Sequence, residues 1–273
     1  MTDQMKRFGL IGHPIEHSLS PALFSAGYYG RYPYELIQTP DFEEAYARFL
    51  TEYDGINVTA PFKELAIKKA DILSEECQVI GATNLLIKTP DGIKAYNSDY
   101  LGVRLWIEQI SRLASLDRCQ RSRLSDSERN DSRKTILVVG LGGAGKAAAE
   151  AARSLGCEVI LINRTQYCEE IRPLSEFREA FKTADIIIYN LPVALPELEH
   201  LGHDDFIEGK RKYILEANYR NPSFDNNLIQ KLKGIHPEFE YTGGQTWLLL
   251  QALTGYEIFT GEKPDLEKMA ASI

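Results

Sequence analysis

The chain has 273 residues, of which 44% are hydrophobic and 26% charged, as is ordinary for a globular protein with one large or two medium domains. Its formal net charge of −8 argues against nucleic acid as a partner, and no apolar run reaches the ~20 residues needed to span a membrane. Because the first residues also lack a signal-peptide pattern, we expect a cytoplasmic protein.

The first hundred residues predict strands that alternate with helices. Strands are expected at residues 8–11, 34–37 and 55–58, and helices at 41–52 and 62–71. A further helix should begin at Ser20-Pro21, with the serine as its cap and the proline at the first helical position. One apolar face of the helix 41–52 is predicted to contain Phe42, Ala45, Phe49 and Leu50.

Two strands at 85–88 and 93–96, joined by Pro90-Asp91-Gly92, predict a hairpin, and a helix over 99–110 follows it. Residues 111–134 are rich in Arg, Ser, Asp and Glu without helical periodicity, which predicts a mobile insertion rather than a basic binding arm. A long apolar helix is expected at 246–259. Between these segments, alternation with helices predicts a parallel sheet of strands at 135–139, 158–162, 185–189 and 213–216.

The segment Asn57-Val58-Thr59-Ala60-Pro61-Phe62-Lys63 is the first candidate site. It leaves a predicted strand and enters a predicted helix, so Lys63 would be held by two rigid elements, with Asn57 and Thr59 at the same rim. A lysine among hydrogen-bonding groups can hold a polyhydroxylated small molecule beside an acid or base. The alternative is a solvated lysine at a helix start.

The turn Gly140-Leu141-Gly142-Gly143-Ala144 is the second candidate site, between a β-branched strand and an alanine-rich helix. In a dinucleotide site of this kind, glycines admit the pyrophosphate and the helix N-terminus supplies free N–H groups. The following strand ends in Asn163-Arg164-Thr165, without the acid that selects NAD. Since Arg164 suits the 2′-phosphate of NADP, we expect NADP as cofactor, with NAD possible.

No metal site is expected. The four cysteines lie far apart in the sequence, so we interpret them as reduced thiols. His200 and His203 have a loose ligand-like spacing, but no third ligand is nearby, and an exposed loop is the better interpretation.

Taken in order, these motifs resemble those of the shikimate dehydrogenase family (shikimate/quinate dehydrogenases), from about Phe8 to Gly261. The stretch from Gly9 to Pro21 is similar to the family's opening motif, whose two serines bind the substrate carboxylate. Asn57 to Glu64 resembles its catalytic lysine motif. Asn97-Ser98-Asp99 is similar to the family's Asn-Thr-Asp, whose Asp is paired with the lysine.

The resemblance implies the roles of individual residues. Lys63 and Asp99 would be catalytic, as a coupled pair that relays a proton and orients the hydroxyl group. The substrate would be bound by Ser18, Ser20, Asn57, Thr59, Asn84, Tyr219 and Gln245. The cofactor would be bound by Gly140, Gly142, Gly143, Ala144, Asn163, Arg164 and Thr165. Ser20 could instead only cap its helix, and Asn84 and Asn97 could be turn residues.

The resemblance also implies two α/β domains with the active site in the cleft between them. Residues 1–102 and 243–273 would form a substrate-binding, catalytic domain with a mixed sheet, and residues 103–242 a Rossmann-type NADP-binding domain with a parallel sheet. The implied enzyme is an oxidoreductase that reversibly reduces 3-dehydroshikimate to shikimate with NADP, in chorismate and aromatic amino acid biosynthesis. It would act as a monomer or homodimer, with a small molecule as its partner.

Two features depart from the family pattern. No second basic residue follows Arg164, so the clamp for the 2′-phosphate is weaker, and a quinate/shikimate dehydrogenase that also uses NAD stays open. The loop from Asn190 to Pro196 lacks the Gly-Met that the family places beside the nicotinamide. This second departure leaves open a non-catalytic sensor of shikimate or dinucleotide.

Overall fold

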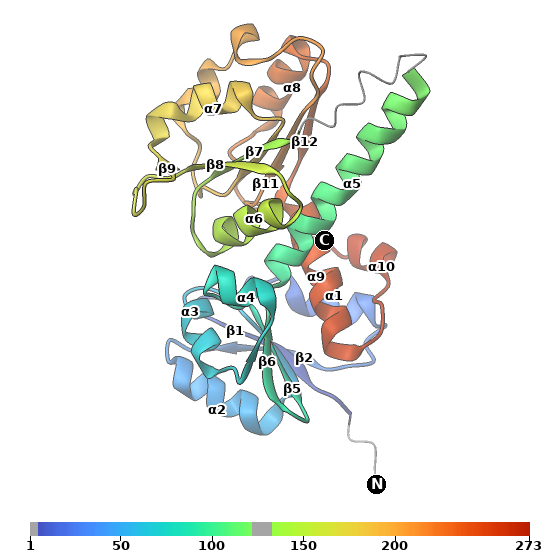
Figure 1. The fold of residues 1–273 in the computed structure, drawn as a ribbon. Helices are drawn as coiled ribbons and strands as arrows, with labels where there is room; N and C mark the ends of the chain where they lie inside the picture. The colour runs from blue at the N-terminus through green and yellow to red at the C-terminus, as the bar shows by residue number, and fades with distance from the viewer. Residues whose placement is uncertain (1–4, 122–132) are drawn as a thin grey trace. The chain divides into compact units, whose positions relative to one another are not determined.

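The computed structural model describes residues 5–121 and 133–273. The chain divides into two compact units, the first formed by Met1–Gly102 with Leu249–Ile273 and the second by Val103–Leu248. Two helices belong partly to each unit, namely α5 (Ser98–Arg121) and α9 (Gly244–Thr260) (Figure 1).

The first unit is built on a mixed six-stranded sheet. Its strands are β1 (Phe8–Gly12), β2 (Tyr34–Gln38), β3 (Gly55–Val58), β4 (Ile72–Leu73), β5 (Leu85–Thr89) and β6 (Gly92–Tyr96). They are ordered β2-β1-β3-β5-β6-β4. The pairs β1/β2, β1/β3 and β4/β6 are parallel, whereas β5 is antiparallel to both β3 and β6, with Asn57 opposite Leu85.

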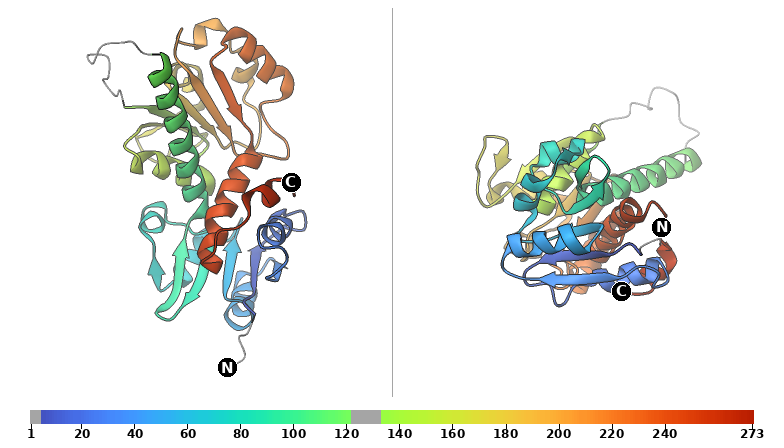
Figure 2. Two further views of the ribbon diagram at one scale, coloured as in Figure 1. Left: turned by 90° about the vertical axis from the view of Figure 1, so that its right-hand side faces the viewer. Right: turned by 90° about the horizontal axis from the view of Figure 1, so that it is seen from below.

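Side chains that alternate along these strands divide the first unit into two layers. Ile56 and Val58 point to the face covered by α2 (Phe42–Glu52), α3 (Lys63–Ala66) and α4 (Glu75–Ile80), where they join one hydrophobic core. Phe8 points to the opposite face, where its ring contacts those of Phe24 of α1 (Ser20–Gly27) and Phe259 of α9. The ribbon views show α9 along this side of the first unit (Figure 2). Asn57, between Ile56 and Val58, therefore points to the face of α1 and α9.

The helices α5 and α9 approach each other closely within the first unit because glycines stand where they meet. A Cβ atom added to Gly102 would lie 2.8 Å from the backbone nitrogen of Gln251. One added to Gly255 would lie 3.1 Å from Cβ of Ser98. This close packing brings Gln251 of α9 to the N-terminus of α5.

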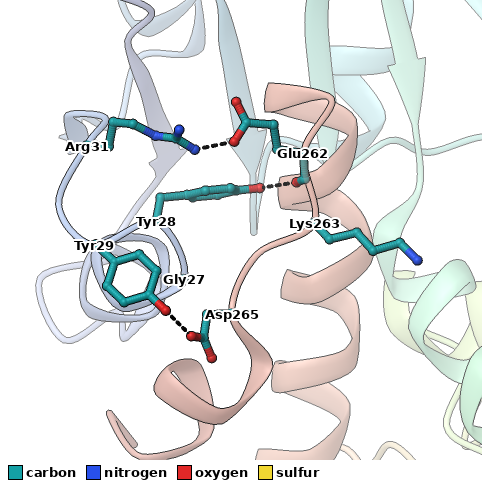
Figure 3. Close-up of a pocket in the computed structure, with 7 residues that line it drawn as sticks. All are labelled: Gly27, Tyr28, Tyr29, Arg31, Glu262, Lys263 and Asp265. Carbon is teal, nitrogen blue, oxygen red and sulfur yellow. Dashed lines mark hydrogen bonds and ion pairs between the residues drawn. The ribbon is translucent and has the colours of Figure 1, made fainter.

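The segment that follows α9 is hydrogen-bonded to the residues that follow α1, around a surface pocket of about 620 Å³ (Figure 3). The Tyr28 hydroxyl donates to the carbonyl of Glu262, the Glu262 carboxylate pairs with Arg31, and Tyr29 donates to Asp265. Asp265 also caps the last helix, α10 (Leu266–Ala270). Since these polar groups bind one another and the side chain of Lys263 points away, the pocket serves as a structural junction.

The second unit contains a parallel six-stranded sheet. Its strands are β7 (Thr135–Val139), β8 (Glu158–Ile162), β9 (Ile171–Arg172), β10 (Ile186–Tyr189), β11 (Lys212–Glu216) and β12 (Phe239–Thr242). They are ordered β12-β11-β10-β7-β8-β9, and every neighbouring pair is parallel. The carboxyl ends of β7, β8, β10 and β11 therefore share one edge, where ligands of such sheets bind.

Helices cover both faces of this parallel sheet. The helix α6 (Gly143–Ser154) packs closely because its buried side chains are alanines. The opposite face contacts α7 (Phe177–Thr183) and α8 (Asn226–Ile235) through a core that contains Phe181 and Leu232. Short 3₁₀ turns complete the described chain, namely η1 (Ile67–Lys69), η3 (Leu174–Glu176), η4 (Pro196–His200) and η5 (His203–Asp205).

The predicted fold class, a mixed sheet and a parallel sheet with helices, is confirmed. Four details were wrong. Ser20 is the first residue of α1 rather than its cap, Leu50 is 45% exposed, and the helix predicted over 62–71 ends at Ala66. The helix α5 continues to Arg121, so the segment 111–121 is helical; residues 122–132 of the predicted insertion lie outside the described part.

The contact between α5 and α9 gives a stability prediction. Gly102→Ala should lower the free energy of unfolding by about 1–3 kcal/mol, because the new methyl group meets the backbone of α9, which cannot move without loss of packing. Gly234→Ala in α8 is the matched control, since nothing lies within 4 Å of its added Cβ. That variant should gain about 0.5–1 kcal/mol from helix propensity.

Urea unfolding of both variants measures these changes. Equal stability of the Gly102→Ala variant and the wild type would contradict the close approach of the two helices.

Candidate active site

The ammonium group of Lys63 donates a hydrogen bond to Oδ2 of Asp99. Lys63 opens α3, just after β3, and Asp99 lies in the first turn of α5, so segments far apart in sequence form the pair. The two side chains are only 20% and 14% exposed. An ion pair that is mostly buried but keeps an accessible edge can exchange a proton with a bound molecule.

The ends of β1 and β3 bring Thr59 beside the loop that carries the two serines. The N–H of Thr59 donates to Ile11 O over 2.9 Å, and the N–H of His13 donates to Ala60 O over 3.2 Å. Gly12 is required here, because an added Cβ would lie 2.4 Å from the methyl group of Thr59.

Ser18 and Ser20 lie side by side at the start of α1. The Ser18 hydroxyl accepts the N–H of Ser20 over 3.2 Å, and the two hydroxyl oxygens are 3.1 Å apart. Thus Ser18, rather than Ser20, satisfies a backbone donor at the start of this helix. The carbonyl of Ser20 in turn accepts the Tyr256 hydroxyl over 3.1 Å. Adjacent hydroxyl groups of this kind can both donate to one carboxylate.

Buried amides form a continuous hydrogen-bonded network near the ion pair. Tyr34 donates its hydroxyl proton to Oδ1 of Asn57 over 2.8 Å; burial raises the pKa of Tyr34 well above its ordinary value, which keeps that proton in place. Nδ2 of Asn57 donates to the carbonyl of Asn84 over 3.2 Å. The side chain of Asn84 then binds Ser98, and Ser98 binds Gln251.

Three members of this network, Tyr34, Ser98 and Gln251, were missed by the sequence interpretation. Ser98 stood inside a recognised motif that was used only for Asp99. Gln251 is a polar residue that follows the apolar run Trp247 to Leu250, and this interruption of an apolar helix was a usable signal. By contrast, the contacts of Asn97 are structural, since its Oδ1 accepts the N–H of Tyr100 in the first turn of α5 over 3.1 Å and its Nδ2 donates to Ala82 O over 3.2 Å.

The remaining predicted site residues belong to the second unit. Gln245 is exposed in the first turn of α9, and Tyr219 lies in the loop after β11 beneath the guanidinium of Arg220. Glu216 holds that loop through its carboxylate, which accepts the N–H groups of Ser223 and Phe224 and the hydroxyl of Tyr241.

The glycine turn between β7 and α6 has the geometry of a phosphate-binding turn. Gly140 has a φ of +86°, in the region that favours glycine, and a Cβ added to Gly145 would lie 1.9 Å from Gly140 O. Gly142 caps α6 without any side chain, and nothing lies within 4 Å of its added Cβ. The first N–H groups of α6 thus lack a side-chain cap, as an anion site requires.

Asn163 connects this turn with the end of β8. Its Oδ1 accepts the N–H of Leu141 over 3.2 Å, and its Nδ2 donates to Thr165 O over 3.0 Å. Arg164 is exposed, and within the described residues no acidic side chain pairs with its guanidinium group. The arginine can therefore turn towards a phosphate group.

The loop from Asn190 to Pro196 is fixed by Tyr189. The Tyr189 hydroxyl donates to Val193 O over 2.8 Å and accepts the N–H of Leu195 over 3.0 Å. At the start of the loop, Oδ1 of Asn190 is buried without a hydrogen-bond partner, and Nδ2 lies 3.5 Å from the Cβ that Gly145 would carry. An orphaned acceptor beneath the glycine turn fits a dinucleotide, whose ribose hydroxyl groups are donors.

Metal ligands and membrane-spanning helices are two further features that could carry a function. Among residues 5–121 and 133–273, no three His, Cys, Asp or Glu side chains are grouped to hold a metal ion. His200 and His203 are exposed on short turns, as predicted. In the described part of the chain, no helix is long and apolar enough to cross a membrane.

Gly142 in the turn and Gly145 in the first turn of α6 give a matched test of the cofactor site. Gly145→Ala should lower the stability of the second unit by at least ~3 kcal/mol, because its Cβ overlaps a backbone oxygen. Gly142→Ala should unfold as the wild type does, yet bind NADPH roughly tenfold more weakly, because a methyl group enters the space open to the phosphates. NADPH fluorescence titration measures the affinity, and unchanged affinity of Gly142→Ala would remove this turn from the cofactor site.

Comparisons with known proteins agree with these two parts. Residues 10–86 match the family model described as shikimate dehydrogenase substrate binding domain. Residues 106–215 match the model described as D-isomer specific 2-hydroxyacid dehydrogenase, NAD binding domain.

Similar proteins extend over nearly the whole chain. The shikimate dehydrogenase (NADP(+)) of Pyrococcus furiosus is 27% identical, over 97% of this chain and 94% of its own length. A pentafunctional AROM polypeptide of Scheffersomyces stipitis is 29% identical over 94% of this chain, which spans only 17% of that longer protein. The structure of shikimate 5-dehydrogenase from Thermus thermophilus in complex with NADP(H) and shikimate has a TM-score of 0.72 and 27% identity, and covers 98% of each chain. This chain belongs to the shikimate dehydrogenase family.

Proposed function

We propose that this protein is an NADP-dependent shikimate dehydrogenase, which reversibly reduces 3-dehydroshikimate to shikimate in the shikimate pathway. The observation that carries this proposal is the largely buried Lys63–Asp99 pair beside a network of buried amides. Hydride transfer to or from an alcohol carbon needs one proton to move at the oxygen, and this pair is placed to move it.

Within the first unit, some residues transfer the proton and others bind the substrate. Lys63 exchanges a proton with the hydroxyl or carbonyl oxygen at the reacting carbon, and Asp99 orients the ammonium group. Asn57, Thr59 and Asn84 bind the ring hydroxyl groups. The adjacent hydroxyls of Ser18 and Ser20 bind the carboxylate. Tyr219, which belongs to the second unit, is kept in the proposal as a further ligand of the same carboxylate.

The second unit would hold the cofactor, which when bound accepts or supplies the hydride. Its residues fit NADP. The uncapped N-terminus of α6 receives the pyrophosphate, Asn163 and Thr165 shape the neighbouring loop, and Arg164 binds the 2′-phosphate. Within the proposal, residues 1–102 with 243–273 are the substrate domain and 103–242 the NADP domain. Gln245, in the first turn of α9, is also proposed as a ligand of the substrate.

The proposal extends to the cellular setting. The enzyme would be cytoplasmic, act as a monomer or homodimer, and have small molecules rather than nucleic acid or membranes as partners. A net charge of −8 is consistent with this choice of partners.

A second candidate, a quinate/shikimate dehydrogenase that also uses NAD, is favoured by one observation. Arg164 is the sole basic residue of Asn163 to Cys168, so the extra affinity for a 2′-phosphate rests on one side chain. The sensor interpretation rested on the Asn190–Pro196 loop, and the fixed position of this loop through Tyr189 gives it no added support.

The first experiment measures NADPH absorbance after mixing protein, shikimate and NADP, with quinate and NAD in parallel. The wild type should produce NADPH from shikimate, and Lys63→Ala should lower kcat by at least ~10³-fold, the range of general acid–base catalysis. Lys68→Ala is the matched control, because it removes the charge of an exposed lysine in the next turn.

The result is decisive in both directions. A kcat of Lys63→Ala within tenfold of the wild-type value would contradict the proposed chemistry. So would wild-type protein that turns over none of the four combinations of substrate and cofactor.

The second experiment compares cofactors. Arg164→Ala should raise KM for NADP about tenfold or more, because that is the loss of affinity expected when one charge-assisted hydrogen bond is removed. KM for NAD, which has no 2′-phosphate, should stay within about twofold of the wild-type value. Arg153→Ala, at the C-terminal end of α6, controls for loss of positive charge in the same unit. Equal changes of KM for both dinucleotides would show that Arg164 does not contact the 2′-phosphate.

A further inference from the structure

Glu216 is the last residue of β11, and its fully buried carboxylate accepts three hydrogen bonds. Its Oε1 accepts the N–H of Ser223, while its Oε2 accepts the N–H of Phe224 over 3.3 Å and the hydroxyl of Tyr241 over 2.7 Å. Burial and the hydrogen bond to Glu216 raise the pKa of Tyr241 above its ordinary value, so this hydroxyl keeps its proton and donates. A carboxylate, which only accepts, satisfies all three donors.

The loop that follows β11 contains a tight turn around Tyr219. The side chain of Asn218 accepts the N–H groups of Arg220 and Asn221, and its Nδ2 donates to Asn221 O over 2.7 Å. The guanidinium carbon of Arg220 lies 5.7 Å from the centre of the Tyr219 ring. Because these bonds close the turn on itself, its four residues move as one piece.

Two attachments hold this turn in place. At its start, the N–H of Ala217 donates to Tyr189 O over 2.9 Å. At its end, the N–H groups of Ser223 and Phe224 donate to Glu216, and in the described part of the chain neither N–H has a second acceptor. Loss of the second attachment would therefore let the turn swing about the first.

The turn also packs against the start of α9, where Gln245 lies. A Cβ added to Gly244 would lie 2.5 Å from Ala217 O and 2.8 Å from the backbone nitrogen of Tyr219. The backbones of the turn and of the helix are therefore in direct contact, and Tyr219 lies close in space to the residue that precedes Gln245.

We propose that Glu216 is a positioning residue, whose carboxylate holds the turn at the start of α9 so that Tyr219 reaches the substrate. This inference rests on the proposed function, in which Tyr219 is a ligand of the substrate carboxylate. A loop that is held before the ligand arrives loses less conformational entropy when the ligand binds.

Glu216→Gln tests the carboxylate without a change of size. The amide has one accepting oxygen, and its nitrogen only donates. The hydroxyl of Tyr241 can reverse and accept, but the N–H groups of Ser223 and Phe224 cannot. In both orientations of the amide, its nitrogen faces one of these two N–H groups, so the end of the turn is repelled.

The first readout is trypsin cleavage after Arg220, the exposed arginine of the turn, in the folded protein. Glu216→Gln should be cleaved there about fivefold faster or more, as expected when about one hydrogen bond no longer opposes local opening. Mass spectrometry identifies the cleavage site.

Lys212→Met is the matched control, because it removes a buried charged group from the first residue of the same strand. The ammonium group of Lys212 binds the carbonyls of Phe181 and Ala184, not the turn. This variant should melt at a lower temperature but keep the wild-type rate of cleavage after Arg220. No acceleration by Glu216→Gln, or equal acceleration by both variants, would overturn the inference.

The second readout is KM for shikimate. Glu216→Gln and Tyr219→Phe should each raise it about fivefold or more, with KM for NADP within about twofold. Since Glu216 acts through Tyr219, adding Glu216→Gln to Tyr219→Phe should change KM by less than about twofold. Additive effects, or faster cleavage with unchanged KM, would indicate a merely structural role of Glu216 and would overturn the inference.

Calorimetric titration with shikimate, without cofactor, separates this inference from the proposed function. Wild-type protein that binds shikimate but does not turn it over would contradict the proposed function, while weaker binding by Glu216→Gln would still support the role of Glu216. Wild-type protein that neither binds nor turns over shikimate would overturn both. Equal affinities of the two proteins would overturn the role of Glu216 alone.

Discussion

The first unit depends on keeping every buried amide hydrogen-bonded. Asn57, Asn84, Asn97 and Ser98 are each less than 10% exposed, and an unpaired buried polar group costs roughly 1–3 kcal/mol. Strands β3 and β5 and helices α5 and α9 must therefore stay in the register that pairs these groups. The requirement that stabilises the unit also holds the polar groups of the candidate site in fixed orientations, before any ligand arrives.

The second unit meets a different constraint, which is steric. Gly140 adopts a positive φ, and Gly145 approaches the carbonyl of Gly140 more closely than any side chain permits. Few side chains contribute to the conformation of this turn, so its binding properties come from the shape of the backbone and from the first N–H groups of α6, which have no side-chain cap. A site of this kind binds a group shared by many cofactors, and under the proposed function selectivity would come from one exposed side chain, Arg164, after the end of β8.

The sequence alone was sufficient to predict the elements of the fold that depend on local residue patterns. Alternating apolar segments and turn residues predicted most strands, the hairpin and the glycine turn, and motif order placed Lys63 and Asp99. The extension of α5 to Arg121 was missed because its last turns are polar, and polarity suggests a loop when periodicity is weak. Tyr34 was missed because its hydrogen bond to Asn57 arises only from the packing of β2 in three dimensions. Gln251 interrupts an apolar run, which marks it as unusual, but its partner Ser98 becomes known only from the packing of α9 against α5. The buried Lys212 shows the same limit. Nothing in the sequence distinguishes it from an exposed lysine, yet its ammonium group donates to the carbonyl of Phe181 in α7 and to that of Ala184 just after the helix, and burial lowers its pKa to about 8.

The placement of the ion pair has a consequence for the charge of the site. Asp99 lies in the first turn of a long helix, where the helix dipole stabilises a carboxylate independently of Lys63. The N-terminus of α5 and the ammonium group of Lys63 therefore both face the Asp99 carboxylate. Since the pair is neutral as a whole, it attracts hydroxyl and carbonyl groups rather than ions. Under the proposed function, the uncharged hydroxyls of Ser18 and Ser20 would bind the carboxylate of the substrate, without competing with Asp99 for the lysine.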